Sequence, residues 1–329
     1  MTKNVSWAVV DNGLDFLERA VGELAESPPD NKYAALHLCS AIEVLIKARL
    51  IREHWTLACS KPDGATQASF AAGDVVTVDP MQGLKRLQSV VGLTISGQQT
   101  SNVDSVRRLR NRAAHFAFVH EDEIAVRTVL GRGLDFALWF LGNHIRPGAP
   151  GDEAEAIDQV MDDITGALTA IKGFVKERLE SLAGDLEAAG VLLACPRCEQ
   201  ATLTMPEGEA PKCLFCFWAS IGEGGADEYV SSVLSYSHYQ VIKDGGTWPV
   251  HSCLNCGDRA LVHGIEVLKD SGKALADLHD PYLPPVFGCF SCSYLGTRLD
   301  LDECGSCGEF TDSGMSVCSD CFEYAVSGD

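Results

Sequence analysis

Cysteine is the residue type with the clearest chemical pattern in this 329-residue chain. Twelve of its fourteen cysteines form six Cys-x-x-Cys pairs, all after position 194. Such a turn directs two sulfurs toward one point, so two turns supply the tetrahedral four-sulfur shell that structural zinc prefers. Pairing neighbouring turns predicts three structural Zn²⁺ sites: Cys195, Cys198, Cys213 and Cys216; Cys253, Cys256, Cys289 and Cys292; and Cys304, Cys307, Cys318 and Cys321.

The three sites differ in the spacing between their pairs. The pairs of the first site are separated by 14 residues and those of the third by 10, which is typical of zinc ribbons. The pairs of the second site are 32 residues apart, so a crossed pairing with another site remains open. In that case His251, just before Cys253, is an alternative ligand.

The role of these sites depends on the charge around them. Residues 1–150 carry 16 Lys+Arg and 16 Asp+Glu, whereas residues 151–329 carry 10 and 30. The functional alternatives are that these cysteine sites bind nucleic acid or that they hold a catalytic metal ion. Excess acid disfavours phosphate binding, and four-sulfur sites have no open position for substrate. We therefore expect zinc that replaces a hydrophobic core, and an acidic surface suited to a protein partner.

A second chemical pattern is the stretch RRLRNRAAHF, residues 107–116. On a helix, Arg110, Asn111 and His115 share one face, and Arg107 lies beside them. Histidine can move a proton near neutral pH, and arginine can hold a phosphate bidentately. A metal-independent ribonuclease needs both groups, and two chains facing each other would supply two histidines. A solvated basic helix face is the alternative.

The motif RNRAAH, from Arg110 to His115, resembles the R-x(4 to 6)-H signature of the HEPN superfamily, including the polar residue after the arginine. Glu43 and Lys47 match the Glu-x-x-x-Lys arrangement that recurs in the second helix of many HEPN domains. The resemblance covers residues 1 to about 146. It implies a helical, dimerising domain that cleaves RNA by attack of the 2′-hydroxyl, with Arg110 and His115 catalytic, Asn111 supporting and Glu43 a further candidate. We expect Glu43 and Lys47, and Arg107 from its helical position, to contact the substrate.

Apolar periodicity places these residues on helices. The pattern of three and four predicts helices over residues 4–27, 32–55, 80–92, a helix through 107–116 capped by Asn102 or Asp104, 121–145 and 153–189. The fold class is therefore mainly α: an antiparallel helical bundle over residues 1–148, a long connector helix over 149–190, and small zinc-ribbon β modules over 191–329.

These features give two candidate functions. The first is a metal-independent endoribonuclease with an RNA substrate and a homodimeric bundle, for which the resemblance implies a role as a toxin or in antiphage defence. The second is a non-catalytic scaffold that dimerises or binds a nucleotide and presents the zinc half to a protein. The chain shows neither a signal peptide nor an apolar run of about 18 residues, so we expect a cytoplasmic protein without membrane attachment.

Overall fold

The chain divides into two compact units, Met1–Ser181 and Leu182–Asp329. The computed structural model describes residues 2–116, 118, 122–270, 286–297, 301–312, 314 and 316–327. The first unit is helical and the second carries small antiparallel sheets, as the sequence predicts; the short helices of the second unit were not predicted. None of the described helices has the length and apolar character needed to cross a bilayer.

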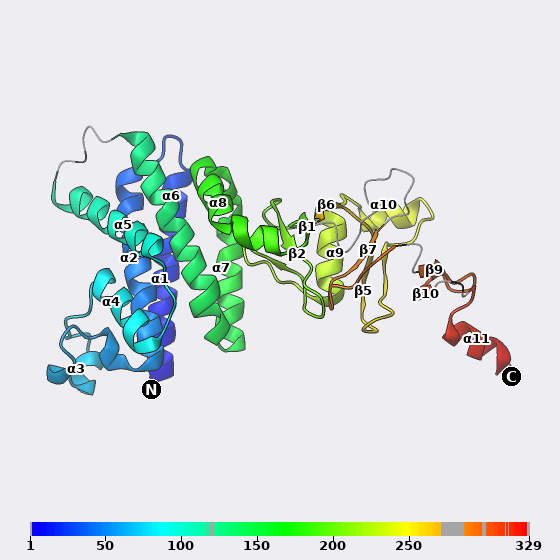
Figure 1. Ribbon diagram of the computed structural model, residues 1–329, viewed down its shortest axis with the longest axis horizontal. Helices are drawn as coiled ribbons and strands as arrows, with labels where there is room; N and C mark the ends of the chain where they lie inside the picture. Colours follow the sequence, from blue (N-terminus) through cyan, green and yellow to red (C-terminus); the bar gives the residue numbers. More distant parts are fainter. Residues whose placement is uncertain are drawn as a thin grey trace. The chain divides into compact units, whose positions relative to one another are not determined.

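Helix α2 is the central element of the first unit. It packs against α1, α4, α5 and α6, and the side-by-side run of α1, α2 and α6 is visible in Figure 1. The bundle helices are α1 (Thr2–Ala25), α2 (Asn31–Glu53), α4 (Pro80–Arg86), α5 (Gly97–His115), α6 (Glu123–Phe140) and α7 (Gly151–Ala170). The apolar stripe of α2, which includes Leu38, Ile42 and Leu45, is fully buried, which confirms the periodicity.

The segment between α2 and α4 consists largely of short helical elements. It contains 3₁₀ turns at Trp55–Ala58 and Pro62–Gly64, and helix α3 (Gln67–Ala71). Cys59 and Thr77 form an isolated antiparallel bridge. The guanidinium of Arg86 on α4 donates hydrogen bonds to the carbonyls of Leu57, Cys59 and Ser60, and so fastens the segment to the bundle.

Helix α5 begins earlier than predicted. Asn102 and Asp104 do not cap it, because Ser96 and Gln99 form a capping box around the first turn. The helix ends at His115, and the next residue, Phe116, is 77% exposed instead of anchored in the core. Because the backbone of Phe116 is extended, its side chain does not follow the spacing of 100° per residue of a helix.

The single helix predicted over residues 153–189 is wrong. Ile171 leaves the helical conformation (φ −82°, ψ 84°) and separates α7 from α8 (Lys172–Ala188). Helix α7 packs on α1. The start of α8 instead approaches α6, where a Cβ on Gly131 would lie 3.5 Å from the backbone of Phe174. A straight helix cannot follow both neighbours, so the expected connector lies largely within the first unit.

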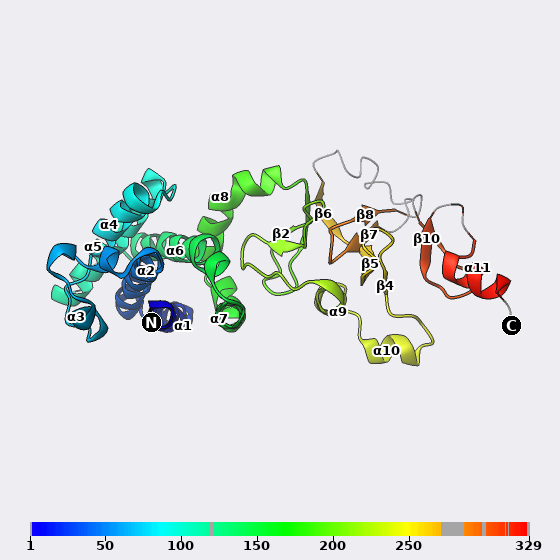
Figure 2. The same cartoon turned by 90° about the horizontal axis from the view of Figure 1, so that it is seen from below.

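The second unit contains three small sheets. Their strand orders are β3-β2-β1-β6, β4-β5-β7-β8 and β10-β9, and Figure 2 shows the strands with helices α9, α10 and α11. The strands are β1 (Val191–Ala194), β2 (Ala201–Thr204), β3 (Lys212–Cys213), β4 (Val250–Ser252), β5 (Arg259–Ile265), β6 (Val267–Asp270), β7 (Val286–Cys289), β8 (Leu295–Gly296), β9 (Leu301–Glu303) and β10 (Phe310–Asp312); the helices are α9 (Gly222–Ser232), α10 (His238–Lys243) and α11 (Ser319–Val326).

The sheets of the second unit are tied together by a few contacts. Strand β6 follows β5 of the second sheet and pairs with β1 of the first. Tyr229 on α9 and the buried Trp218 both contact the ring of Phe290. The third sheet reaches the second through Phe310, whose ring packs at 4.6 Å on Phe287. Aromatic side chains such as Trp218, Phe287 and Phe290 are fully buried in this unit.

Candidate functional site

Three clusters of four cysteines form the candidate metal sites. In each cluster the four Sγ atoms lie within 4.8 Å of one another, and the members are the three sets predicted by pairing neighbouring turns. The second cluster joins its two distant pairs, because the 32-residue gap holds all of β5 and most of β7, and these two strands pair antiparallel with each other. A crossed pairing, with His251 as a substitute ligand, is therefore wrong.

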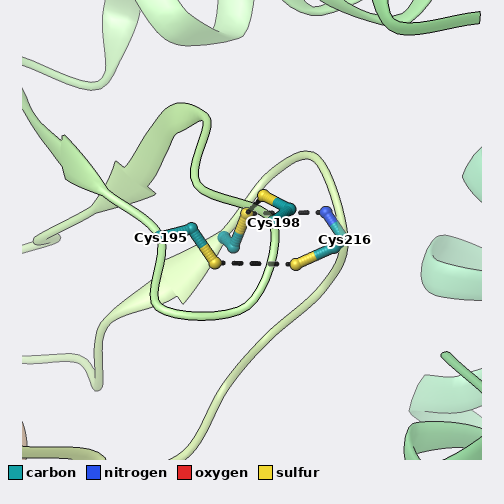
Figure 3. A group of neighbouring side chains, drawn as sticks. Cys195, Cys198 and Cys216 are labelled. Carbon is teal, nitrogen blue, oxygen red and sulfur yellow. Dashed lines mark hydrogen bonds between the residues drawn. The ribbon is translucent and has the colours of Figure 1, made fainter. Parts of the chain in front are cut away.

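The sulfur spacing within the clusters fits a tetrahedral metal ion. Cys195 Sγ lies 3.6 Å from Cys216 Sγ (Figure 3), and Cys198 Sγ lies 3.7 Å from Cys213 Sγ. Zinc–thiolate bonds of about 2.3 Å in a tetrahedron place the sulfurs about 3.8 Å apart, whereas a disulfide would need about 2 Å. The cross-pair distances of 3.7 and 3.9 Å in the second cluster and 3.7 Å in the third fit equally well.

Backbone amides support the sulfurs of each cluster. The amide of Cys216 donates to Cys213 Sγ at 3.4 Å, and that of Cys318 donates to Cys304 Sγ at 3.2 Å. The latter bond is the main cause that lowers the pKa of Cys304 to about 6. In the second cluster, the hydrogen bond with the Cys289 thiol lowers the pKa of Cys253 to about 5.

The clusters differ in their access to solvent. All four cysteines of the first cluster are buried. In the second, Cys256 is exposed and Cys292 half-buried, and in the third only Cys304 is buried. With four sulfur ligands, none of the sites keeps a position for a reacting water, so the arrangement suits a structural metal.

A separate cluster of charged side chains lies where α2 meets α5. Glu43 on α2 receives a hydrogen bond from Lys47 at 2.6 Å, and its other carboxylate oxygen lies 3.5 Å from Arg110 on α5. All three side chains are half-buried. The structure therefore brings together the Glu-x-x-x-Lys pair and the motif arginine, which are more than 60 residues apart in the sequence.

Cys39 is a neighbour of this cluster that the sequence did not indicate. It lies one turn before Glu43 on α2 and is buried. Burial raises the pKa of the Cys39 thiol, while a hydrogen bond and the charge of Arg110 act in the opposite direction. A neutral Cys39 thus packs against Arg110 and helps to hold it at the helix interface.

Arg107 has a carboxylate partner on its own helix. Its Nε and Nη2 donate to one carboxylate oxygen of Asp104 at 3.0 and 2.6 Å. The other oxygen of Asp104 lies 2.7 Å from Nε of Arg108, which is mostly exposed. Sequence analysis missed this role of Asp104, although its position three and four residues before two arginines is a recognisable ion-pair spacing.

His115 and Asn111 occupy the last turns of α5. Asn111 is half-buried, and His115 is exposed at the final helical residue. Within the described part of the chain, His115 has no hydrogen bond or ion pair. Its exposed ring can approach a substrate.

No protein-family model, curated protein or solved structure matches this chain. The candidate functions therefore rest on the two kinds of site described above.

Proposed function

We propose that the chain is a metal-independent endoribonuclease whose helical unit carries the catalytic residues. The observation that supports this most is the arrangement of Arg110 with Glu43 and Lys47 across α2 and α5, with the unpartnered His115 at the end of α5. These are the residues on which the resemblance to HEPN domains rests. That resemblance also suggests a homodimer and a role as a toxin or in antiphage defence.

In the proposed reaction, His115 takes the proton of a ribose 2′-hydroxyl. The 2′-oxygen attacks the adjacent phosphorus, and the bond to the 5′-oxygen breaks as that oxygen gains a proton from the second chain's copy of the histidine. The products are a 2′,3′-cyclic phosphate and a free 5′-hydroxyl. Arg110 neutralises charge on the phosphate oxygens, and Asn111 orients the phosphate or His115.

We propose that the metal in the three cysteine clusters is zinc with a structural role. Four thiolates per ion leave no site for substrate, and each loaded cluster carries a formal charge of −2. This charge adds to the acid excess after residue 150. The second unit therefore suits recruitment of a protein partner or regulation better than contact with RNA.

An RNA cleavage assay with product ends mapped tests the nuclease. Brief EDTA treatment, too short to strip structural zinc, should leave cleavage intact and produce cyclic phosphate ends. Arg110→Ala and His115→Ala should each lower the rate by about 100-fold or more. Arg108→Ala is the matched control, because Arg108 lies on the same helix but is mostly exposed and turned toward Asp104. Equal cleavage by all of these variants would disprove the mechanism.

The alternative is a non-catalytic scaffold, and one observation favours it. Arg110 and Arg107 already have carboxylate partners in Glu43 and Asp104, so both charges are neutralised without a ligand. A scaffold predicts no RNA cleavage under any condition and partner binding that survives His115→Ala. The same cleavage assay therefore separates the two functions.

A further inference from the structure

We propose a second site in the helical unit, a pocket between the end of α2 and the turn after α6 that binds the phosphate group of a small molecule. The pocket has a volume of about 370 Å³ and is lined by Arg49, Arg52, Glu53, Asn143, His144, Pro147 and Gly148. Ligand pockets begin at about 300 Å³, so the space admits a phosphate with a small group attached. This proposal is independent of the nuclease.

The charges of the pocket favour an anion. Arg49 is paired with Glu53 at 2.7 Å. Arg52 donates to the carbonyl of Ile145, and its nearest carboxylate, Glu153, is 3.9 Å from Nη2. With His144 neutral, which its lowered pKa favours, the lining residues carry one net positive charge before Glu153 beside Arg52 is counted. A phosphate oxygen can take the place of a carboxylate partner at Arg49 or Arg52.

Two buried nitrogens of the lining residues lack hydrogen bonds. Nη2 of Arg52 and Nε2 of His144 are buried, and neither has a hydrogen-bond partner among the residues that the structure describes. Buried polar groups are satisfied in most proteins, so two unsatisfied nitrogens on residues that line one pocket indicate a ligand or water. An arginine and a histidine together match the oxygens of a phosphate.

Like charges in the pocket also repel one another. Burial is the largest cause that lowers the pKa of His144, and the charge of Arg49 is the second. Burial likewise lowers the pKa of Arg52; the charge of Glu153 opposes this effect and that of Arg49 adds to it. A bound anion would relieve the repulsion among all three groups.

The backbone after α6 builds the opposite wall. Leu141–Ile145 forms a π turn, a local geometry that is frequent at functional sites. It presents Asn143 and His144 together, and the ring of His144 is held edge-on against Trp139 at 4.8 Å. The histidine is therefore positioned before any ligand arrives.

The pocket is distinct from the cluster around Arg110. On α2, Arg52 lies nine residues after Glu43, which places the two side chains on opposite sides of the helix at 100° per residue. Mutations can therefore remove phosphate binding at one site and leave the other site intact.

Isothermal titration with inorganic phosphate, against chloride of matched ionic strength, tests the proposal in the Arg110→Ala/His115→Ala protein. This background removes phosphate binding at the proposed nuclease site. We expect saturable binding, weakened about tenfold or more by Arg49→Gln. Arg19→Gln is the control. Arg19 lies on α1, outside the residues that line the pocket, and is paired with Asp15 on the surface, so the substitution removes one positive charge without changing the pocket.

Gly148→Leu provides a test that leaves the arginines intact. A Cβ on Gly148 would lie 3.3 Å from Nη1 of Arg52, the flexible end of that side chain, so leucine should fold and fill the pocket. We expect it to abolish phosphate binding. Tighter binding of ribose 5-phosphate than of phosphate would identify a phosphorylated metabolite, and equal binding would identify phosphate itself. Absence of saturable binding, or binding unchanged in Gly148→Leu, would overturn the proposal.

Discussion

At the scale of the residue, His144 makes the stability of the helical unit depend on pH. Burial, together with the charge of Arg49, lowers the pKa of His144 below its ordinary value of about 6.5. The unfolded chain therefore binds a proton more readily than the folded one, so this contribution is complete above pH 6.5 and is lost as the pH falls. In phosphate-free buffer, His144→Asn should flatten the fall in urea-unfolding free energy between neutral and mildly acidic pH. Parallel pH profiles for the two proteins would contradict this account.

The candidate site residues were predictable to different degrees. The cysteine ligands follow from covalent spacing, because a Cys-x-x-Cys turn fixes the relation of its sulfurs whatever surrounds it. The contact of Arg110 with Glu43 could not come from helical periodicity, which relates residues of one helix only; the resemblance singled out both residues but not their contact. The pocket of Arg52 and His144 gave no signal, because it depends on a π turn that no sequence pattern marks.

At the scale of the element, Gly133 allows α6 to pack closely on the two helices that carry the charged cluster. A Cβ there would lie 2.5 Å from Cγ2 of Val106 on α5 and 2.9 Å from Cδ2 of Leu38 on α2. Gly133→Ala should therefore destabilise the unit by about 1–3 kcal/mol through overpacking. Gly166→Ala on α7, which meets no atom within 4 Å, should instead stabilise it by up to about 1 kcal/mol. Thermal unfolding of both variants checks the contrast, and equal effects would refute the packing explanation.

The elements themselves were predictable where local signals agree with packing. Helix α2 has a continuous apolar stripe and an N-terminal cap at Asp30, whose carboxylate accepts from the amides of Lys32 and Tyr33, so its limits were close to those predicted. Ser96 and Gln99 were overlooked as a cap because polar loop residues surround them. The break at Ile171 depends on which helix each half packs against, and a continuous apolar stripe does not contain that information.

At the scale of the whole molecule, the two units should respond differently to loss of metal. All twelve clustered cysteines lie in Leu182–Asp329, whereas the first unit has its own apolar core. Since structural zinc can contribute about 10–16 kcal/mol of apparent folding free energy, prolonged chelation should unfold the second unit. The first unit should keep its helical circular dichroism and its unfolding transition. Loss of both units together would show that they do not fold independently.

The exposure of the clusters predicts an order of metal release. The protein as isolated should contain three zinc ions, and a thiol-binding mercurial reaches exposed sulfurs first. Cys307 is exposed and Cys318 and Cys321 are half-buried, whereas every ligand of the first cluster is buried. Zinc release should therefore proceed from the third cluster to the second and then the first. A colorimetric indicator follows the release while mass spectrometry identifies the modified cysteines; early release from the first cluster would contradict this order.

Cys307→Ser and Cys198→Ser each leave three sulfurs in one cluster, so they form a matched pair. Cys198→Ser should disturb the folding of the second unit more, because all four cysteines of its cluster are buried next to β1 and β2.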